Sequence, residues 1–215
     1  MLAAIEEGDA RKLAELMRQD PGFKVNKAVD GNGNTLLHDA CGGIRDRSPV
    51  IPLLLAHPDI DVNTKNAYGT TAFFCACGGI RDRPPSLREM LKDSRVKVNE
   101  PDKDGWTPLW WAAFNGFLDI IKWWIASGRE MDLGTPGDVD TTDAIGGAKK
   151  YGKTEVVTLL ERFKENPEET RHQVRLEIGL VDELAAEMFA IVVFVSDELL
   201  QINDTTPSPA ANSDS

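Results

Sequence analysis

A short helix-opening motif recurs every 36 residues and constrains the fold of this chain more than any other feature. The motif reads Thr35-Leu36-Leu37-His38, then Thr71-Ala72-Phe73-Phe74, then Thr107-Pro108-Leu109-Trp110, and Asp143-Ala144-Ile145 starts a fourth copy at the same interval. A fixed period of this length indicates small units stacked side by side, because a single helix pair cannot bury its apolar face alone. Function is therefore expected on the surface of the stack.

Other landmarks keep nearly the same spacing. A glycine precedes each Thr by two positions, and a second apolar segment follows each motif; these segments are residues 13–17, 50–55, 87–91, 120–125 and 156–160. Five second helices against four first-helix motifs predict that the chain begins part-way through a unit. Residues 2–7 would then form a shortened first helix that covers the end of the stack.

The third unit carries the fullest set of these features, from Asp102 through Gly105, Thr107-Pro108-Leu109 and Ala112-Ala113 to Gly116. These residues resemble the ankyrin-repeat family, whose signature combines a Gly, the motif T-P-L-H-x-A, a Gly-containing turn, an apolar second helix and D-V-N. The unit departs from that pattern where Trp110 replaces the usual His. The resemblance covers residues 1–164 and implies helix-turn-helix units joined by hairpin-like loops, with a protein-binding role.

We therefore expect an all-α, ankyrin-like solenoid of four repeats plus an N-terminal partial repeat at residues 1–164. The sequence Asn166-Pro167-Glu168-Glu169 is typical of a helix start. A helical segment at residues 165–203 is expected to cap the last repeat, with dimerisation through the same surface as the alternative; residues 191–195 also allow a strand. The composition of residues 204–215 predicts a disordered tail.

Charge is unevenly placed along the chain. The formal net charge is −11, but residues 1–164 hold 24 acidic and 22 basic side chains, a balance of −2, so the remaining −9 belongs to residues 165–215. A nearly neutral repeat region disfavours nucleic acid as a partner. The longest apolar run, residues 188–195, is too short for a membrane-spanning helix, and the N-terminus shows no secretory signal.

Cysteine and histidine usage predicts neither a metal site nor a cofactor. The three cysteines, Cys41, Cys75 and Cys77, fall on first helices, where small buried packing residues are expected rather than a disulfide. The three histidines lack the spacing of metal ligands. These features predict an intracellular, cytoplasmic protein.

Aromatic side chains of the third unit are the expected anchors for a protein partner. In a stack of this kind the loop tips and the exposed side of the first helices form a concave face, and Trp106, Trp111 and Phe114 fall on it. We expect Trp106 and Phe114 to contact the partner, with packing between units as the alternative, which is favoured for Trp111. The polar residues around them, expected to select the partner, are Lys103, Asp104 and Asn115.

An insertion repeated in the first two units adds a second candidate contact, which is charged. Both copies read Cys-Gly-Gly-Ile-Arg-Asp-Arg, at residues 41–47 and 77–83. Stacking would align their arginines into a ladder able to bind an acidic patch on a partner. The alternative is that the aspartates of the insertion pair with these arginines and stiffen the loop. The four arginines are Arg45, Arg47, Arg81 and Arg83.

One motif suggests a nucleotide hydrolase instead. Residues Gly147 to Thr154 match the phosphate-binding pattern G-x-x-x-x-G-K-[ST], with Lys153 and Thr154 in the key positions, and residues 191–198 resemble an apolar strand ending in acidic Mg²⁺ ligands. That pattern needs a buried strand directly before its first Gly, yet residues 138–143 are polar. The 36-residue register also makes residues 143–150 a helix. We therefore expect a binding protein with no catalytic residues, and the hydrolase is the alternative.

Overall fold

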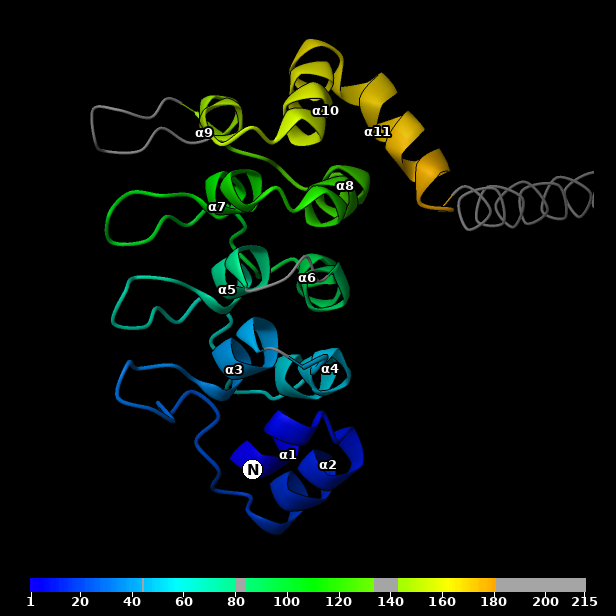
Figure 1. Ribbon diagram of the computed structural model, residues 1–215. Helices are drawn as coiled ribbons and strands as arrows, with labels where there is room; N and C mark the ends of the chain where they lie inside the picture. The colour runs from blue at the N-terminus through cyan, green and yellow to red at the C-terminus, as the bar shows by residue number, and fades with distance from the viewer. Residues whose placement is uncertain (44, 80–83, 134–142, 181–215) are drawn as a thin grey trace, which may run out of the picture. The chain divides into compact units, whose positions relative to one another are not determined.

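The computed structural model describes residues 1–43, 45–79, 84–133 and 143–180. The chain divides into two compact units, Met1–Val174 and Arg175–Ser215. In the first unit helix follows helix, and successive pairs stack along one direction (Figure 1). The predicted all-α solenoid is confirmed by the described residues, which contain helices and no strand.

Four helices of one layer carry the recurring motif. They are α3 (Leu36–Gly42), α5 (Ala72–Gly78), α7 (Pro108–Asn115) and α9 (Ala144–Lys150). Side-chain caps explain why each helix starts where it does, because a cap accepts from a backbone N–H that has no partner inside the helix. The hydroxyl of Thr107 accepts from the backbone N–H of Trp110 at 3.2 Å, and Asp143 plays the same role at α9.

The second layer follows the apolar segments. It comprises α2 (Ala10–Gln19), α4 (Ile51–Leu55), α6 (Pro84–Lys92), α8 (Leu118–Ser127) and α10 (Thr154–Glu165). A 3₁₀ turn, η1 (Ser48–Val50), precedes α4, so the regular helix begins one residue after the predicted segment. The predicted short first helix is confirmed as α1 (Leu2–Glu7), which pairs with α2.

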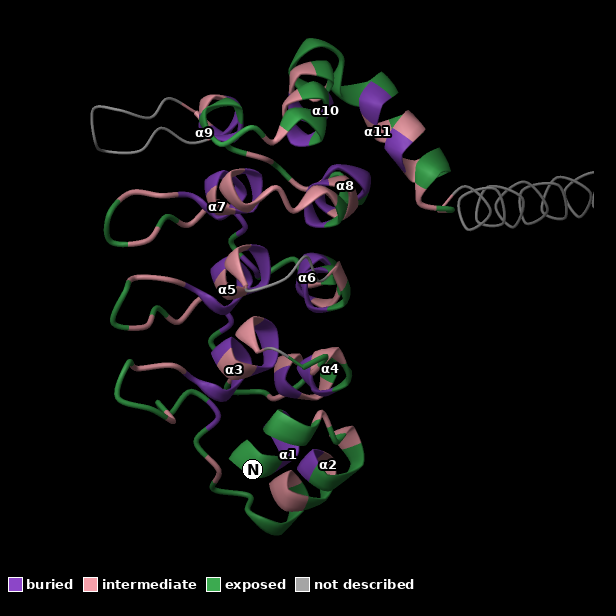
Figure 2. Ribbon diagram, viewed as in Figure 1, coloured by how far each residue is buried: buried purple, intermediate pink, exposed green. Residues whose placement is uncertain are grey.

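The core lies between the two layers and between successive pairs. Figure 2 shows buried residues on the facing sides of the helices. Small residues let neighbouring first-layer helices approach, and Ala76 and Ala112 are at most 3% exposed. Phe73 of α5 meets Trp124 of α8 edge to face, with ring centroids 5.0 Å apart, and both rings are fully buried. Burying each such ring stabilises the stack by about 1.5–3 kcal/mol.

Asparagines at the end of each unit bond the units together. Asn26 donates from Nδ2 to the carbonyl of Asp59 at 2.7 Å, and its Oδ1 accepts from the backbone N–H of Asp61 at 2.9 Å. Asn63 makes the corresponding pair of bonds one repeat further on, and Asn99 accepts from the following unit. These recurring asparagines therefore fix the spacing between successive repeats.

The predicted helix after the repeats is confirmed as α11 (Pro167–Glu177), where Asn166 caps the backbone N–H of Glu169. The expected second C-terminal helix and tail lie outside the described residues. No helix in the part of the chain that the structure describes is long and apolar enough to span a bilayer.

Candidate protein-binding surface

Three finger loops, residues 30–34, 66–70 and 102–106, project from the first-layer helices. In each loop the first side chain accepts from two backbone N–H groups. Asp102, for example, accepts from Asp104 at 3.0 Å and from Trp106 at 2.9 Å. A glycine with φ between +75° and +87° closes each turn, a conformation that favours glycine. The loops therefore hold one shape without help from a partner.

Neighbouring fingers are also bonded to each other. The backbone N–H of Ala67 donates to the carbonyl of Asn32 at 2.8 Å, and that of Lys103 donates to the carbonyl of Tyr68 at 3.1 Å. Together with the first-layer helices, the fingers form what we call the concave face. These hydrogen bonds tie each finger to its neighbour along the stack.

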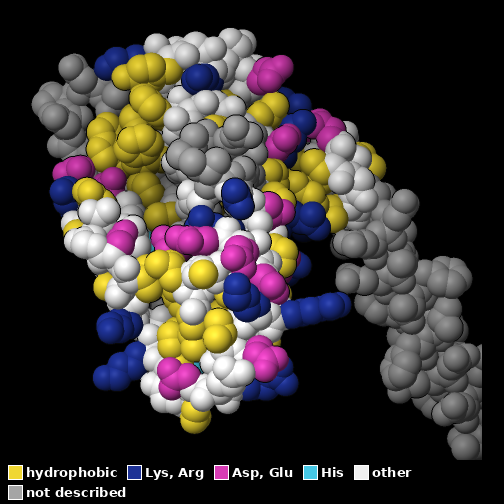
Figure 3. Space-filling view, turned by 60° about the horizontal axis from the view of Figure 1, so that its bottom comes forward, with side chains coloured by type: hydrophobic (Ala, Val, Ile, Leu, Met, Phe, Trp, Pro, Cys, Tyr) yellow, Lys and Arg dark blue, Asp and Glu magenta, His cyan; other side chains and the backbone are white. Residues whose placement is uncertain are grey.

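Five rings form an aromatic cluster where the third finger meets α7 and the end of α9. Trp106 packs on Trp110 with ring centroids 3.9 Å apart, and Phe114 stacks on Trp110 at 5.1 Å. Trp111 and Tyr151 meet Phe114 edge to face at 5.5 and 4.4 Å. Figure 3 shows hydrophobic side chains gathered in a column at the upper left of the view.

Exposure differs across the aromatic cluster. Trp110 is 5% exposed, and Tyr151 is 48% exposed. Trp106, Trp111 and Phe114 lie between these limits, each partly covered. The expected contact residues therefore pack against one another and still present part of each ring to solvent, so packing and partner contact are compatible roles.

The polar residues expected around the aromatic cluster differ in availability. Lys103 and Asp104 are exposed at the tip of the third finger, and the ammonium of Lys103 lies 5.5 Å from the centre of the Tyr68 ring. Asn115 instead donates from Nδ2 to the carbonyl of Trp111 at 2.8 Å, so its amide group is engaged within α7.

The first insertion places one arginine against the protein and one in solvent. Arg47 donates from Nη1 to the carbonyl of Asp39 at 2.9 Å and lies so close to Gly43 that a Cβ there would meet it at 2.8 Å. Burial raises the pKa of the Asp39 carboxyl, and the guanidinium of Arg47 opposes that shift. Arg45 is exposed.

Asp46 of the first insertion and the arginines of the second bear on the predicted arginine ladder. Asp46 accepts from the backbone N–H of Ser48 at 2.9 Å, and among the described residues its carboxylate forms no ion pair with an arginine. Arg81 and Arg83 lie outside the described residues, and the arginine ladder stays a prediction.

The segment with the phosphate-binding pattern spans the end of α9, a turn and the first residue of α10. Backbone N–H groups along it are used within α9 and the turn: Gly147 donates to Asp143, Tyr151 donates to Gly147, and Lys153 donates to Ala148. A phosphate-binding loop needs such groups free to point at the ligand. The geometry of this segment therefore does not fit the hydrolase alternative.

The cysteines are free thiols in a packed interior. Burial raises the pKa of Cys41 and Cys77 well above its usual value, and that of Cys75 to about 11. Within the described ranges, no group of three His, Cys, Asp or Glu side chains is placed to hold a metal ion.

Sequence reasoning missed two features of this surface. Trp110, which the sequence marks only as a replacement for His, is the ring that Trp106, Trp111 and Phe114 all contact. Tyr151 is not among the predicted contact residues. Its position 36 residues after Asn115, itself a predicted contact residue, was the signal that could have found it.

The fold and this surface define a solenoid of helix-turn-helix repeats with projecting loops. Residues 44–135 match the family model described as ankyrin repeats (3 copies), and this part of the chain is an ankyrin-repeat array. No curated protein matches the chain. Ankyrin repeats generally act as protein–protein interaction modules and are typically non-catalytic.

Proposed function

We propose that this protein is a non-catalytic scaffold that binds a partner protein on the concave face, with Trp106 and Phe114 as anchors. The observation that carries the proposal is the aromatic cluster, in which partly exposed rings stand on a buried Trp110. Interface energy concentrates in a few large aromatic or arginine side chains held in well-packed surroundings. Rings already fixed by their neighbours lose little rotamer freedom when a partner covers them.

Charged residues at the edge of this face would select the partner. Lys103 and Asp104 are exposed at the tip of the third finger, and Arg45 is exposed in the first insertion. Such peripheral charges steer association and discriminate between partners more than they add affinity. An acidic patch on the partner would complement Arg45 and Lys103. The three free thiols suit the reducing interior of the cell, where we place the protein.

Affinity capture from lysate, followed by titration with the captured partner, tests the proposal. The double variant Trp106→Ala/Phe114→Ala should lose the partner, with affinity at least about 30-fold weaker, because truncating a central aromatic anchor costs 2 kcal/mol or more. The matched control is Trp123→Ala, which removes a partly exposed tryptophan from α8, where the guanidinium of Arg88 stacks at 3.9 Å from its ring.

Thermal unfolding of both variants separates loss of contact from loss of fold. Unchanged affinity in a folded double variant would remove Trp106 and Phe114 as anchors. Binding lost only on changing Arg45 and Arg47 would move the site to the insertions.

A further inference from the structure

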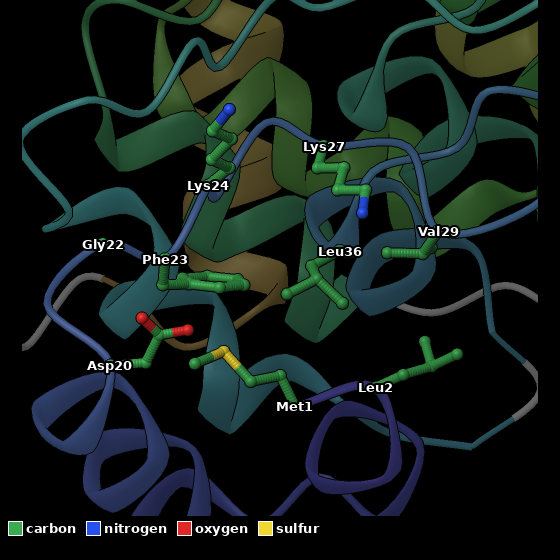
Figure 4. A pocket seen from close by; sticks show the side chains of 9 residues that line it. All are labelled: Met1, Leu2, Asp20, Gly22, Phe23, Lys24, Lys27, Val29 and Leu36. Carbon is green, nitrogen blue, oxygen red and sulfur yellow. The ribbon is translucent and has the colours of Figure 1, made fainter.

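A cleft at the N-terminal end of the stack lies apart from the aromatic cluster and is not explained by it. Its volume is about 450 Å³, within the range of small ligand sites. Figure 4 shows Met1 and Leu2 of the N-terminal segment facing Phe23, Leu36 and Val29 across it. We call this space the N-terminal cleft. Five of the side chains that line it are apolar.

The charges at the N-terminal cleft favour an anionic ligand. Lys24 and Lys27 are exposed, and neither has an acidic partner among the residues that the structure describes. Figure 4 shows the ammonium of Lys27 directed toward Leu36 and Val29, whereas that of Lys24 points away. A single carboxylate, Asp20, lies on the opposite side. The two lysines outnumber the one carboxylate, so the charge at the cleft complements an acidic side chain. The apolar lining complements an apolar side chain next to it.

The finger loops supply an independent observation that points to an extended ligand. Ala67 and Lys103, at corresponding places in the second and third fingers, each donate a backbone N–H to the preceding finger. Gly31 holds that place in the first finger, two residues after Val29. It is exposed, and its N–H has no acceptor in the described part of the chain. An extended segment can add to such an edge and provide the missing carbonyl.

We propose that the N-terminal cleft binds an extended segment of a partner protein in which an apolar residue adjoins an acidic one. The apolar side chain enters between Leu2 and Phe23, the acidic side chain faces Lys27, and a backbone carbonyl accepts from Gly31. This site does not use the aromatic cluster, so it stands or fails separately from the proposed function. A scaffold with both sites could hold two segments at once.

Amide chemical-shift mapping on the ¹⁵N-labelled full chain tests this proposal with a defined probe. The probe is the acetylated, amidated pentapeptide Glu-Val-Leu-Val-Glu, titrated to about 5 mM so that millimolar affinities are detected. We expect saturable shifts at residues 22–36, including Gly31. The control peptide Lys-Val-Leu-Val-Lys should bind markedly more weakly, because it keeps the apolar residues and reverses the charge.

Two charge reversals give matched protein controls. Lys27→Glu should weaken the affinity for the Glu-Val-Leu-Val-Glu peptide by about fivefold, because an attraction between opposite charges becomes a repulsion at a surface site. Lys164→Glu reverses an exposed lysine of α10 and should leave the affinity unchanged. Both changes are at exposed positions, and unchanged shifts elsewhere would show that the fold is kept.

Several outcomes would overturn the proposal. They are a peptide titration without saturable shifts, equal binding of the two peptides, and shifts centred on Trp106 and Phe114. Shifts of the cleft amides with protein concentration alone would assign the cleft to a second copy of this chain. Stronger binding of decanoate than of the peptide at these amides would assign it to a small amphiphile.

Discussion

Three glycines with the same backbone conformation test how much the contacts between finger loops stabilise the stack. Gly33, Gly69 and Gly152 have φ of +77°, +75° and +67°. Alanine at each position therefore meets a similar left-handed strain of about 1 kcal/mol. They differ in what a new Cβ would touch. At Gly152 it would meet nothing within 4 Å, whereas at Gly33 it would lie 3.4 Å from the backbone nitrogen of Ala67. At Gly69 it would lie only 2.6 Å from the backbone nitrogen of Lys103.

The contact at Gly69 cannot be relieved by rotating a side chain, because the neighbouring atom is backbone. Forcing extra volume into a packed contact costs about 1–3 kcal/mol. Moving the third finger also weakens the bond from the N–H of Lys103 to the carbonyl of Tyr68, worth about 1 kcal/mol. Adding the shared strain of about 1 kcal/mol, we expect Gly69→Ala to lower the free energy of unfolding by about 3–5 kcal/mol. The corresponding loss is about 1–2 kcal/mol for Gly33→Ala and about 1 kcal/mol for Gly152→Ala.

Urea unfolding followed by circular dichroism and by tryptophan fluorescence measures these differences. The two probes are complementary because all five tryptophans lie between residues 106 and 124, whereas circular dichroism reports every helix. Disagreement between the probes would show that the array unfolds in parts, which repeat proteins can do. Equal losses for Gly69→Ala and Gly152→Ala would refute the reasoning, since the fingers would then contribute no more than the backbone strain.

Three further predictions concern the buried groups of the first-layer helices. Burial lowers the pKa of the His38 imidazole below its usual value of 6.5, so the unfolded chain binds a proton at this residue more readily than the folded chain does. The free energy of unfolding therefore falls as the pH drops below about 6.5, and His38→Phe should lessen the accompanying decline in melting temperature. Gly147→Ala would place a Cβ 2.9 Å from Nε1 of Trp110 and should lower the free energy of unfolding by about 1 kcal/mol, although alanine forms helices better than glycine. A higher melting temperature of this variant would contradict the close contact. Cys41 and Cys77 should react with a thiol reagent at pH 8 only in denaturant, because burial keeps both thiols protonated; rapid labelling of the native chain would count against the packed interior.

Local features of the sequence predicted the helices well. A capping residue, a turn glycine and an apolar segment each act within one unit, so the 36-residue period located all four first-layer helices. The small departure at α4 has a local cause as well. Pro49 and Pro52 lie at the start of η1 and α4, where a residue without a backbone N–H is tolerated, and the first turn is 3₁₀.

The arrangement of the aromatic cluster could not be predicted from local features. Trp106 and Phe114 both pack on Trp110, which is in the same unit, and Phe114 also meets Tyr151, which comes from the next one. Distances between side chains of different repeats are set by how closely the helices stack, and spacing along the chain does not report that distance. The sequence places Trp106, Trp111 and Phe114 in one unit but does not show that Trp110 supports all three rings.

The residues that imitate a phosphate-binding loop show how a repeat array creates a misleading motif. Gly147 is 36 residues after Trp111, and its missing side chain leaves room for the indole of Trp110. Gly152 is the left-handed turn residue between α9 and α10, with φ of +67°. The aliphatic stem of Lys153 packs on Gly116, where a Cβ would meet its Cδ at 2.8 Å. Gly147 and Lys153 thus pack against residues of the preceding repeat, and Gly152 closes the turn between two helices, so stacking accounts for three residues of the apparent nucleotide motif.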